Sequence, residues 1–441
     1  MDDSPPTRRA KLLYASSSLG SEALSQSRGL WILYVYAPPR SADLPRLLPL
    51  GLAGLLLSID GVIGAFYYPI ISYLTDRTRS RLGRRLPYIL VATPLWALFA
   101  VLVFTPPSGA GTTGIAVYLI ITLELGSISA TFSGSAFQAL LPEIARRSSD
   151  RMSVIGMRTY FGAAGAAVGL VGASLLVDHA GVRTMAIVMA AIALVTRYLG
   201  TIGVWHRASR TQPPPEIRFW GALRATFANG QFLALLPSIV LFQAGVAMIL
   251  AVLPYDVKAV LGVHKPGTYV AIFTALAIVS MVASIPFAAR RARRSSMRET
   301  YRRAMLAAAC IFPLLALAGL APGVPKSVQI GLVMVIAGPA LAGIYLFPDA
   351  LTSDVIDDEE RRLAMRREAM YFGSANFVSQ LVTSLVPLML GLLLLLGDSS
   401  RHQLGLRLAG PVGGVLVLLG YVVFRSYNLP DEVAPAISPA G

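Results

Sequence analysis

Long apolar runs alternate with short polar segments along the whole chain. A helix needs about 20 apolar residues to cross the hydrocarbon core of a bilayer, and the runs reach this length again and again. The expected membrane-spanning runs are 12–38, 47–74, 86–105, 114–141, 154–178, 184–205, 232–256, 267–289, 304–322, 327–350, 369–396 and 406–427. This pattern predicts an all-α membrane protein with twelve transmembrane helices.

A polar segment divides these runs into two sets of six. Residues 206–224 contain Pro213, Pro214 and Pro215 together with several arginines, a composition typical of a linker. The predicted parts are an N-terminal six-helix half (1–205), a cytoplasmic linker (206–224), a C-terminal six-helix half (225–427) and a cytoplasmic tail (428–441). Two such halves, with a basic loop after the second span of each, are typical of a duplicated transporter.

The arginine clusters predict the orientation of the chain. Residues 76–85 hold five arginines between two apolar runs, and basic loops of this kind stay in the cytoplasm. The other basic loops are 146–151, 206–224, 290–303 and 361–367. The opposite loops, such as 106–114 and 323–326, carry almost no positive charge. We therefore expect a multi-pass protein of the cell (inner) membrane with both termini in the cytoplasm.

Composition excludes several classes of protein. The 441 residues are 55% hydrophobic and only 14% charged, which a soluble globular chain does not show. The net charge of +15 lies mostly in loops beside apolar runs, so the expected partner is the anionic bilayer surface and not nucleic acid. Met1–Lys11 is polar and predicts a retained N-terminus without a signal peptide. Cys310, the only cysteine, forms no disulfide framework or metal site. We expect no metal or cofactor, and the pattern requires no more than a monomer.

Several segments resemble the glycoside-pentoside-hexuronide:cation symporter family, the melibiose-carrier branch of the major facilitator superfamily. The matching segments are Lys11-Leu-Leu-Tyr14, Asp76-Arg-Thr-Arg-Ser-Arg-Leu-Gly-Arg-Arg-Leu-Pro-Tyr88, Leu141-Pro-Glu-Ile-Ala145, Arg158-Thr-Tyr-Phe-Gly162, Ser353-Asp-Val-Ile-Asp-Asp-Glu359, Arg366-Arg-Glu368 and Tyr371-Phe-Gly373. The resemblance implies the major facilitator fold and secondary active transport of a sugar or glycoside by alternating access. It also implies that the chain is not an enzyme, and no catalytic motif is evident.

The same loops supply candidates for a cytoplasmic gate. Charge pairs at helix ends can tie those ends together in one state and separate in another, provided that each pair is weak. The gate candidates are Asp76, Arg79, Gly83, Arg84, Arg151, Asp354, Asp357, Arg366 and Glu368. The alternative is that these are solvated loop charges.

Polar residues inside the spans are candidates for solute binding, because charges there are costly and usually functional. The first span carries Glu22 among six serines, so it is expected to face water and not lipid. By the resemblance, Glu22 and Arg158 fall where melibiose-type carriers keep a sugar-binding acid and arginine. The alternative for Glu22 is a buried ion pair with Arg28 or another arginine. The further substrate-binding candidates are Gln138, Tyr68, Gln380 and Asn376.

The chain differs from this family at the residues that bind the coupling cation. The positions that correspond to the family's cation-binding acids hold Gly64, Tyr68 and Gly134, so the usual Na⁺ site is absent. Asp60 and Glu22 are the candidates for H⁺ coupling, because a buried carboxyl can carry a proton. A structural role for Asp60, as a hydrogen-bond partner between helices, stays equally open.

Three functions follow from these observations. The first is a secondary active transporter of a sugar, glycoside or similar small solute, with H⁺ coupling left open. The second is a transporter of a lipid, amphiphilic natural product or drug, since fewer charges line the expected site. The third is a membrane sensor or assembly partner that does not transport.

Overall fold

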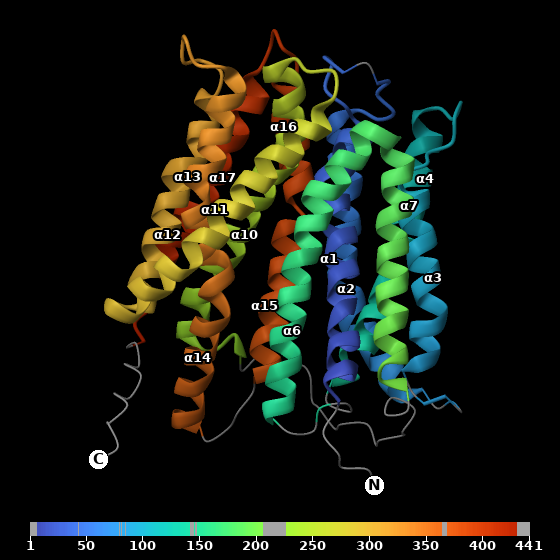
Figure 1. Cartoon of the computed structure of the whole chain (residues 1–441), viewed down its shortest axis with the longest axis vertical. Helices are drawn as coiled ribbons and strands as arrows, with labels where there is room; N and C mark the ends of the chain where they lie inside the picture. The colour runs from blue at the N-terminus through green and yellow to red at the C-terminus, as the bar shows by residue number, and fades with distance from the viewer. Residues whose placement is uncertain are drawn as a thin grey trace. The chain divides into compact units, whose positions relative to one another are not determined.

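The computed structural model describes residues 7–42, 44–78, 80, 82–83, 85–141, 145, 148–205, 226–363 and 368–429 (Figure 1). Within these ranges all regular structure is helical, so the all-α class is confirmed. The chain divides into two compact units, which are described separately below. Unit 1 comprises Met1–Glu216, Leu250–Ala275 and Ser384–Leu406; unit 2 comprises Ile217–Ile249, Leu276–Thr383 and Arg407–Gly441. The division into two six-helix halves stays a prediction.

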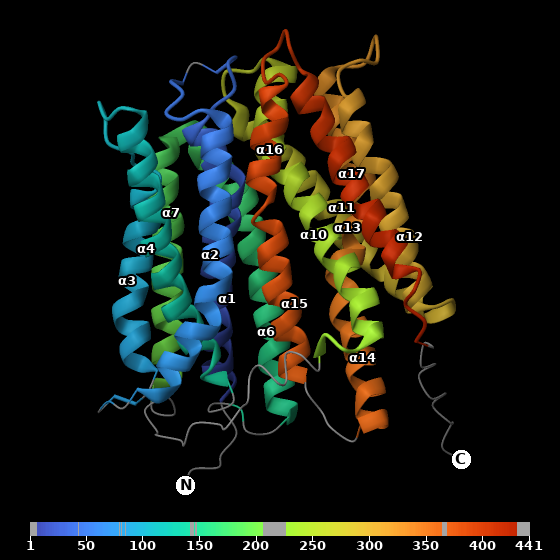
Figure 2. The same ribbon diagram turned by 180° about the vertical axis from the view of Figure 1, so that it is seen from behind.

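Unit 1 is built mainly from the first part of the chain. Its helices are α1 (Arg8–Tyr36), α2 (Leu50–Arg77), α3 (Leu86–Leu102), α4 (Thr112–Gln138), α6 (Ser148–Ala167), the π-helical η1 (Val168–Gly172), α7 (Ala173–Ile202) and α16 (Val386–Leu395). It also takes in the end of α10 (Gly230–Asp256), the π-helical η2 (Val257–Leu261) and the start of α11 (Pro266–Arg294). The long helices of this unit run side by side (Figure 2).

Small residues let α1 approach its neighbours closely. A Cβ atom at Gly165 or Gly169 would lie 2.1 or 2.4 Å from backbone oxygens of α1, those of Leu19 and Ala23 respectively. On another side of α1, a Cβ atom at Gly20 would lie 2.6 Å from the α-carbon of Ala193 in α7. Close backbone approach at small residues is the usual packing mode of membrane helices. It fixes α1 between α6 and α7, with its polar residues held at definite positions.

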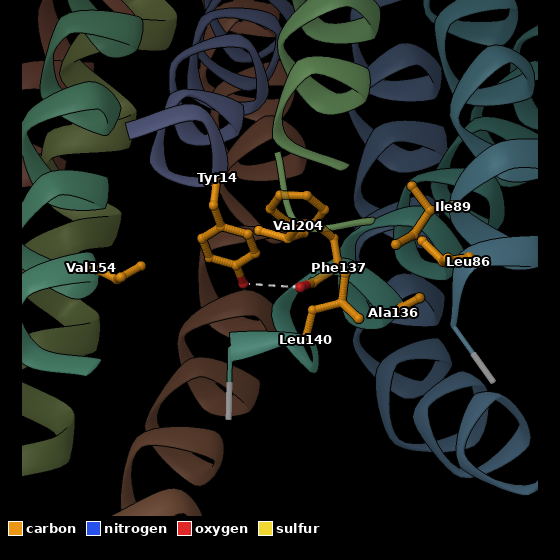
Figure 3. Close-up of a cluster of buried hydrophobic side chains, with 8 residues drawn as sticks. All are labelled: Tyr14, Leu86, Ile89, Ala136, Phe137, Leu140, Val154 and Val204. Atoms are coloured by element: carbon orange, nitrogen blue, oxygen red, sulfur yellow. Dashed lines mark hydrogen bonds between the residues drawn. The ribbon is translucent and has the colours of Figure 1, made fainter. Parts of the chain in front are cut away.

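An apolar core joins the same end of several helices of unit 1 (Figure 3). The Tyr14 ring stacks on Phe137 with centroids 4.5 Å apart, and its hydroxyl donates a hydrogen bond to the Phe137 carbonyl oxygen at 3.0 Å. The cluster also contains Leu86, Ile89, Ala136, Leu140, Val154 and Val204. Lys11 and Asp150, each a few residues along the chain from a member of this cluster, form an ion pair of 2.7 Å that ties the start of α1 to the start of α6. This end of the unit is therefore packed firmly.

α16 joins unit 1 by packing on α2. A Cβ atom at Gly54 would lie 2.4 Å from the Pro387 carbonyl oxygen, and one at Gly61 would lie 2.3 Å from the Ser384 β-carbon. The Leu388 amide donates a hydrogen bond to the hydroxyl of Ser58 at 3.1 Å. A helix from late in the chain is therefore in backbone contact with a helix from its start.

Unit 2 holds the rest of the chain. Its helices are most of α10 and α11, α12 (Met297–Ile311), the 3-10 helix η3 (Phe312–Leu317), α13 (Lys326–Leu346), α14 (Pro348–Leu363), α15 (Glu368–Thr383) and most of α17 (Leu404–Phe424). Buried aromatic rings fill its core, with Tyr301 packed edge-on against Phe424 at 5.1 Å. α14 continues past the expected span 327–350 to Leu363, because its charged residues form helix although they lack the apolar length of a span.

Nine helical stretches among the described residues are long and apolar enough to cross a membrane. One of them, Ser153–Ile202, has 50 residues, and at 1.5 Å per residue it is long enough for two crossings. The chain turns within it at Gly181, whose φ of 82° favours glycine. α1 is not among the nine, because its serines and charges lower its mean hydropathy. The number of twelve crossings stays a prediction.

Candidate functional site

Glu22 and Arg158 lie on facing helices of unit 1. Glu22 is on α1, and a Cβ atom at Gly162 of α6 would be 3.6 Å from its γ-carbon. Glu22 accepts a side-chain hydrogen bond from Gln26 and interacts electrostatically with Arg158. The Arg158 Nε atom donates to the Ser18 hydroxyl at 3.3 Å, again on α1. An acid, a guanidinium and neutral polar groups are thus brought together, a set that can bind hydroxyl groups of a solute.

A second arginine supports α1 from α7. The Arg197 Nη2 atom donates to the Ser21 hydroxyl at 2.9 Å, and its Cζ atom lies 4.7 Å from the centroid of the Phe137 ring. Arg197 is 6% exposed, and its Nε atom has no hydrogen-bond partner among the described residues. Phe137 is 1% exposed and belongs to the apolar core. Arg197 therefore braces the polar face of α1 and the adjoining aromatic core.

Asp60 is held between two other helices. Its Oδ1 atom accepts a hydrogen bond from the Ser127 hydroxyl of α4 at 2.7 Å. Its Oδ2 atom lies 3.5 Å from Nη2 of Arg28 on α1. Arg28 is thus the partner of Asp60, and the alternative in which it pairs with Glu22 is not seen. Both oxygens of Asp60 are engaged, which favours the structural role that the sequence left open.

Glu124 of α4 is a second acid that interacts with Asp60. It was not among the site residues predicted from sequence. The Tyr67 hydroxyl, on α2, donates a hydrogen bond to Oε2 of Glu124 at 2.5 Å. The other carboxylate oxygen, Oε1, is buried and has no hydrogen-bond partner among the described residues. Glu124 was visible in the sequence as one of the few acids inside a span, but its neighbours depend on how the helices are rotated.

Two carboxylates link segments at the end of unit 1 that lies opposite the start of α1. Asp398, after α16, accepts a hydrogen bond from the Arg40 amide at 3.2 Å and forms ion pairs with the side chains of Arg40 and Arg46. Asp178, on α7, accepts from the amides of Gly267 and Thr268 at 2.8 and 2.5 Å. Both amides belong to the first turn of α11, where a negative charge is favourable. Segments from late in the chain are therefore tied to early helices at this end.

An aromatic contact reinforces the same end. The Tyr255 hydroxyl donates a hydrogen bond to the Ala37 carbonyl oxygen at 2.9 Å. Its ring packs edge-on against Tyr34 at 5.4 Å, and Tyr255 is fully buried. Together with the two carboxylates, this contact closes the end of unit 1 that lies farthest from Lys11 and Asp150.

The remaining predicted site residues are distributed over both units. Gln138 is exposed at the end of α4 in unit 1, whereas Asn376 and Gln380 are exposed one turn apart on α15 in unit 2. The side chain of Tyr68 lies outside the part of the chain that the structure describes. The proposed solute site, with Glu22 and Arg158 in it, stays a prediction.

The gate candidates are described only in part. Gly83 has a φ of 90° and donates its amide to the Ser80 carbonyl oxygen at 3.1 Å, so a glycine suits this turn. Asp354 and Asp357 are half-buried on α14. The side chains of Asp76, Arg79, Arg84, Arg151, Arg366 and Glu368 lie outside the described residues. The cytoplasmic gate therefore stays a prediction.

These features together define a polytopic helical membrane protein with charged groups held inside its spanning helices. Within the described ranges, no group of three His, Cys, Asp or Glu residues is placed to hold a metal ion. Residues 46–426 match the family model described as "MFS/sugar transport protein". The chain therefore belongs to this transporter family of the major facilitator superfamily, whose members are not enzymes. The family-level resemblance read from the sequence motifs is confirmed.

The curated relatives match shorter stretches. An uncharacterized symporter of Synechocystis is 30% identical over 129 residues, which are 28% of this chain and 24% of the relative. The uncharacterized symporter YnaJ of Bacillus subtilis is 26% identical over 151 residues, 34% of this chain and 31% of the relative. The alignments thus span only a quarter to a third of the length of these relatives.

A solved structure shows the same fold. The crystal structure of a point mutant of the nucleoside transporter NupG covers 94% of this chain with a TM-score of 0.63, and 99% of the NupG chain is aligned. The sequence identity is 13%. This likeness supports the major facilitator fold and is silent on the solute.

Proposed function

We propose that the chain is a secondary active transporter that moves a sugar, a glycoside or a similar hydroxyl-rich solute by alternating access. The observation that carries this proposal is the placement of Glu22 and Arg158 on facing helices, where they interact electrostatically beside Ser18 and Gln26. A carboxylate accepts hydrogen bonds from hydroxyl groups, and a guanidinium donates them in a fixed fork. Family membership and the symporter names of the relatives support the same function.

The proposed transport cycle uses an outer gate in unit 1 and a cytoplasmic gate. The contacts of Asp398 and Asp178 form the outer gate, and the gate candidates in the arginine-rich loops form the cytoplasmic one. Both gates must open and close in alternation, so each is built from contacts that can be broken one at a time. The positive charge of the loops supports a location in the cell (inner) membrane with both termini in the cytoplasm.

The proposed coupling ion is H⁺. The family's acids are replaced at Gly64, Tyr68 and Gly134, and a hard cation requires several oxygen ligands that include carboxylates. A buried acid that gains and loses a proton needs no such set of ligands. An intramembrane carboxyl would therefore carry the driving ion.

A thermal-shift screen of the purified protein tests the solute. Sugars, glycosides, nucleosides, lysolipids and amphiphilic drugs are compared at mildly acidic and mildly alkaline pH, with and without Na⁺. A ligand at 100 times its dissociation constant stabilises the folded state by about 2.7 kcal/mol. We expect stabilisation by a hydroxyl-rich solute, loss of this effect in Glu22→Gln, and no dependence on Na⁺.

The matched control is Glu299→Gln, because Glu299 pairs with Arg302 and Arg303 on the surface of α12. The control should retain the ligand effect. Stabilisation by lysolipids or drugs alone would reject the sugar proposal in favour of an amphiphile carrier. A hydroxyl-rich ligand that stabilises Glu22→Gln as strongly as the parent would remove Glu22 from the site.

A further inference from the structure

We propose that Glu124 carries the coupling proton, and that Asp60 and Arg28 form a permanent ion pair beside it. This inference rests on the proposed H⁺-coupled transport and assigns it to a residue that neither the motifs nor the resemblance singled out. The group comprises Glu124 of α4, Asp60 and Tyr67 of α2, and Arg28 of α1, all in unit 1.

The two acids differ in their partners. Asp60 has a hydroxyl donor on one oxygen and a guanidinium 3.5 Å from the other. Glu124 has a neutral phenol on Oε2, whereas Oε1 is buried without a hydrogen-bond partner among the described residues. An ionised carboxylate with one buried, unsatisfied oxygen is costly in a spanning helix. Protonation of Glu124 removes this cost, whereas protonation of Asp60 would leave Arg28 without its anionic partner.

The charge of the group points to a single proton. With both acids ionised, two negative charges face the one positive charge of Arg28, and a net charge inside the spans is unfavourable. One proton on Glu124 makes the group neutral and leaves the Arg28–Asp60 pair intact. The group is thus suited to bind one H⁺ in one state of the cycle and to release it in another.

Among the side chains that the structure describes on the packed elements, no other titratable group changes this balance. α3, which packs against α4, contains one such residue, Tyr88, whose hydroxyl is hydrogen-bonded to Thr78 at 2.6 Å. On α4 itself, the Tyr118 hydroxyl donates to the Leu102 carbonyl oxygen at 2.7 Å. Both tyrosines are committed to other partners, so Tyr67 and Asp60 are the described side chains that act on Glu124, and Arg28 is the partner of Asp60.

α1 connects this group to the proposed solute site. Arg28 and Glu22 lie on the same helix, so a shift of α1 on solute binding changes the distance between Arg28 and Glu124. The binding of a proton to Glu124 then depends on whether the solute is bound, as coupling requires. The geometry gives α1 this role because it alone contributes to both groups of residues.

Infrared difference spectroscopy tests the assignment without the unknown solute. The purified protein in lipid vesicles is compared at acidic and alkaline pH, and the C=O stretching band of a protonated carboxyl is followed. We expect the parent to show this band on acidification and Glu124→Gln to lose it. In Asp60→Asn the band should remain but appear only at lower pH, because Glu124 becomes the sole acid beside Arg28. Glu299→Gln, the surface control, should match the parent.

A second variant keeps the inference open to refutation if Glu124→Gln does not fold. Tyr67→Phe removes the donor to Oε2, so the band should shift to higher frequency while keeping its intensity. An unchanged frequency would contradict the geometry. A band that survives Glu124→Gln and disappears in Asp60→Asn would make Asp60 the carrier, and a band that Na⁺ abolishes at fixed pH would indicate a cation site. Both results overturn the proposal.

The same spectra separate this inference from the proposed function. If the band behaves as expected but no solute enters vesicles under any gradient, the proton site stands and the transport proposal fails. If a solute enters under a proton gradient and Glu124→Gln transports it with unchanged dependence on that gradient, the transport proposal stands and the assignment to Glu124 fails.

Discussion

Removal of the Asp398 carboxylate should open the outer gate of unit 1. Asp398 is 4% exposed and accepts a hydrogen bond from the Arg40 amide at 3.2 Å. It also pairs with the side chains of Arg40 and Arg46, which are 77% and 27% exposed. These contacts hold the segment after α16 on the loop between α1 and α2. Asp398→Ala deletes all of them at once.

The expected size of the effect follows from the kind of each contact. A backbone hydrogen bond to a carboxylate contributes about 1.5–3 kcal/mol, and each exposed ion pair contributes about 0–1 kcal/mol. A total of about 1.5–5 kcal/mol corresponds to about a 10-fold to 5,000-fold rise in the open population. Asp398→Asn keeps an acceptor for the amide and loses only the ion pairs, so its effect should be about fivefold.

A cysteine on α2 can report the opening. Ser58 is 3% exposed and accepts a hydrogen bond from the Leu388 amide of α16. In the Ser58→Cys variant, made in a Cys310→Ser background, the new thiol should react with a water-soluble maleimide only when α16 leaves α2. When opening and closing are faster than the reaction, the labelling rate follows the open population. The rate should therefore rise by the factors given above.

The control is Glu299→Ala, which removes an acid with two arginine partners from a single helix of unit 2. It should leave the labelling rate of the Ser58→Cys thiol unchanged. Equal rates in Asp398→Ala and its parent would show that these ion pairs do not hold α16 in place. The interpretation of this end as a gate would then be refuted.

Two further substitutions test packing and the second outer contact. Gly165→Ala should lower the thermal midpoint, because the new Cβ atom would lie 2.1 Å from the Leu19 carbonyl oxygen; Gly156→Ala, where no atom lies within 4 Å, should not lower it. An equal midpoint for both variants in a melting experiment would contradict the close contact of α1 and α6. Asp178→Ala should raise the labelling rate at a Ser58→Cys thiol by about tenfold or more, since it removes charge-assisted bonds to two amides of α11. An unchanged rate would mean that the start of α11 moves independently of α16.

The length of the apolar runs in the sequence predicted most of the helices. The run 232–256 corresponds to α10 (Gly230–Asp256), and 86–105 corresponds to α3 (Leu86–Leu102). The run 369–396 is in fact two helices, α15 and α16, with a break just before Pro387. Mean hydropathy does not reveal such a break, because Thr383 and Ser384 are only two polar residues within a long apolar run.

The candidate site was predictable as a set of residues but not as a set of contacts. Charges inside spans stand out in the sequence, so Glu22, Asp60 and Glu124 could be recognised. Which of them faces Arg28 depends on the rotation of each helix, and a helix that is apolar on all sides carries no signal of its rotation. The partner of Arg28 and the donor to Glu124 therefore required the structure.

Uptake into proteoliposomes tests the central claim most directly. Purified protein is reconstituted, a proton gradient is imposed, and the accumulation of radiolabelled sugars, glycosides and nucleosides is measured beside that of Glu22→Gln. The account predicts that at least one hydroxyl-rich solute accumulates in the parent, that collapse of the gradient stops the accumulation, and that Glu22→Gln abolishes it. If no such solute enters under either a proton or a sodium gradient while lipid analogues do, the proposal of a sugar-type transporter is contradicted.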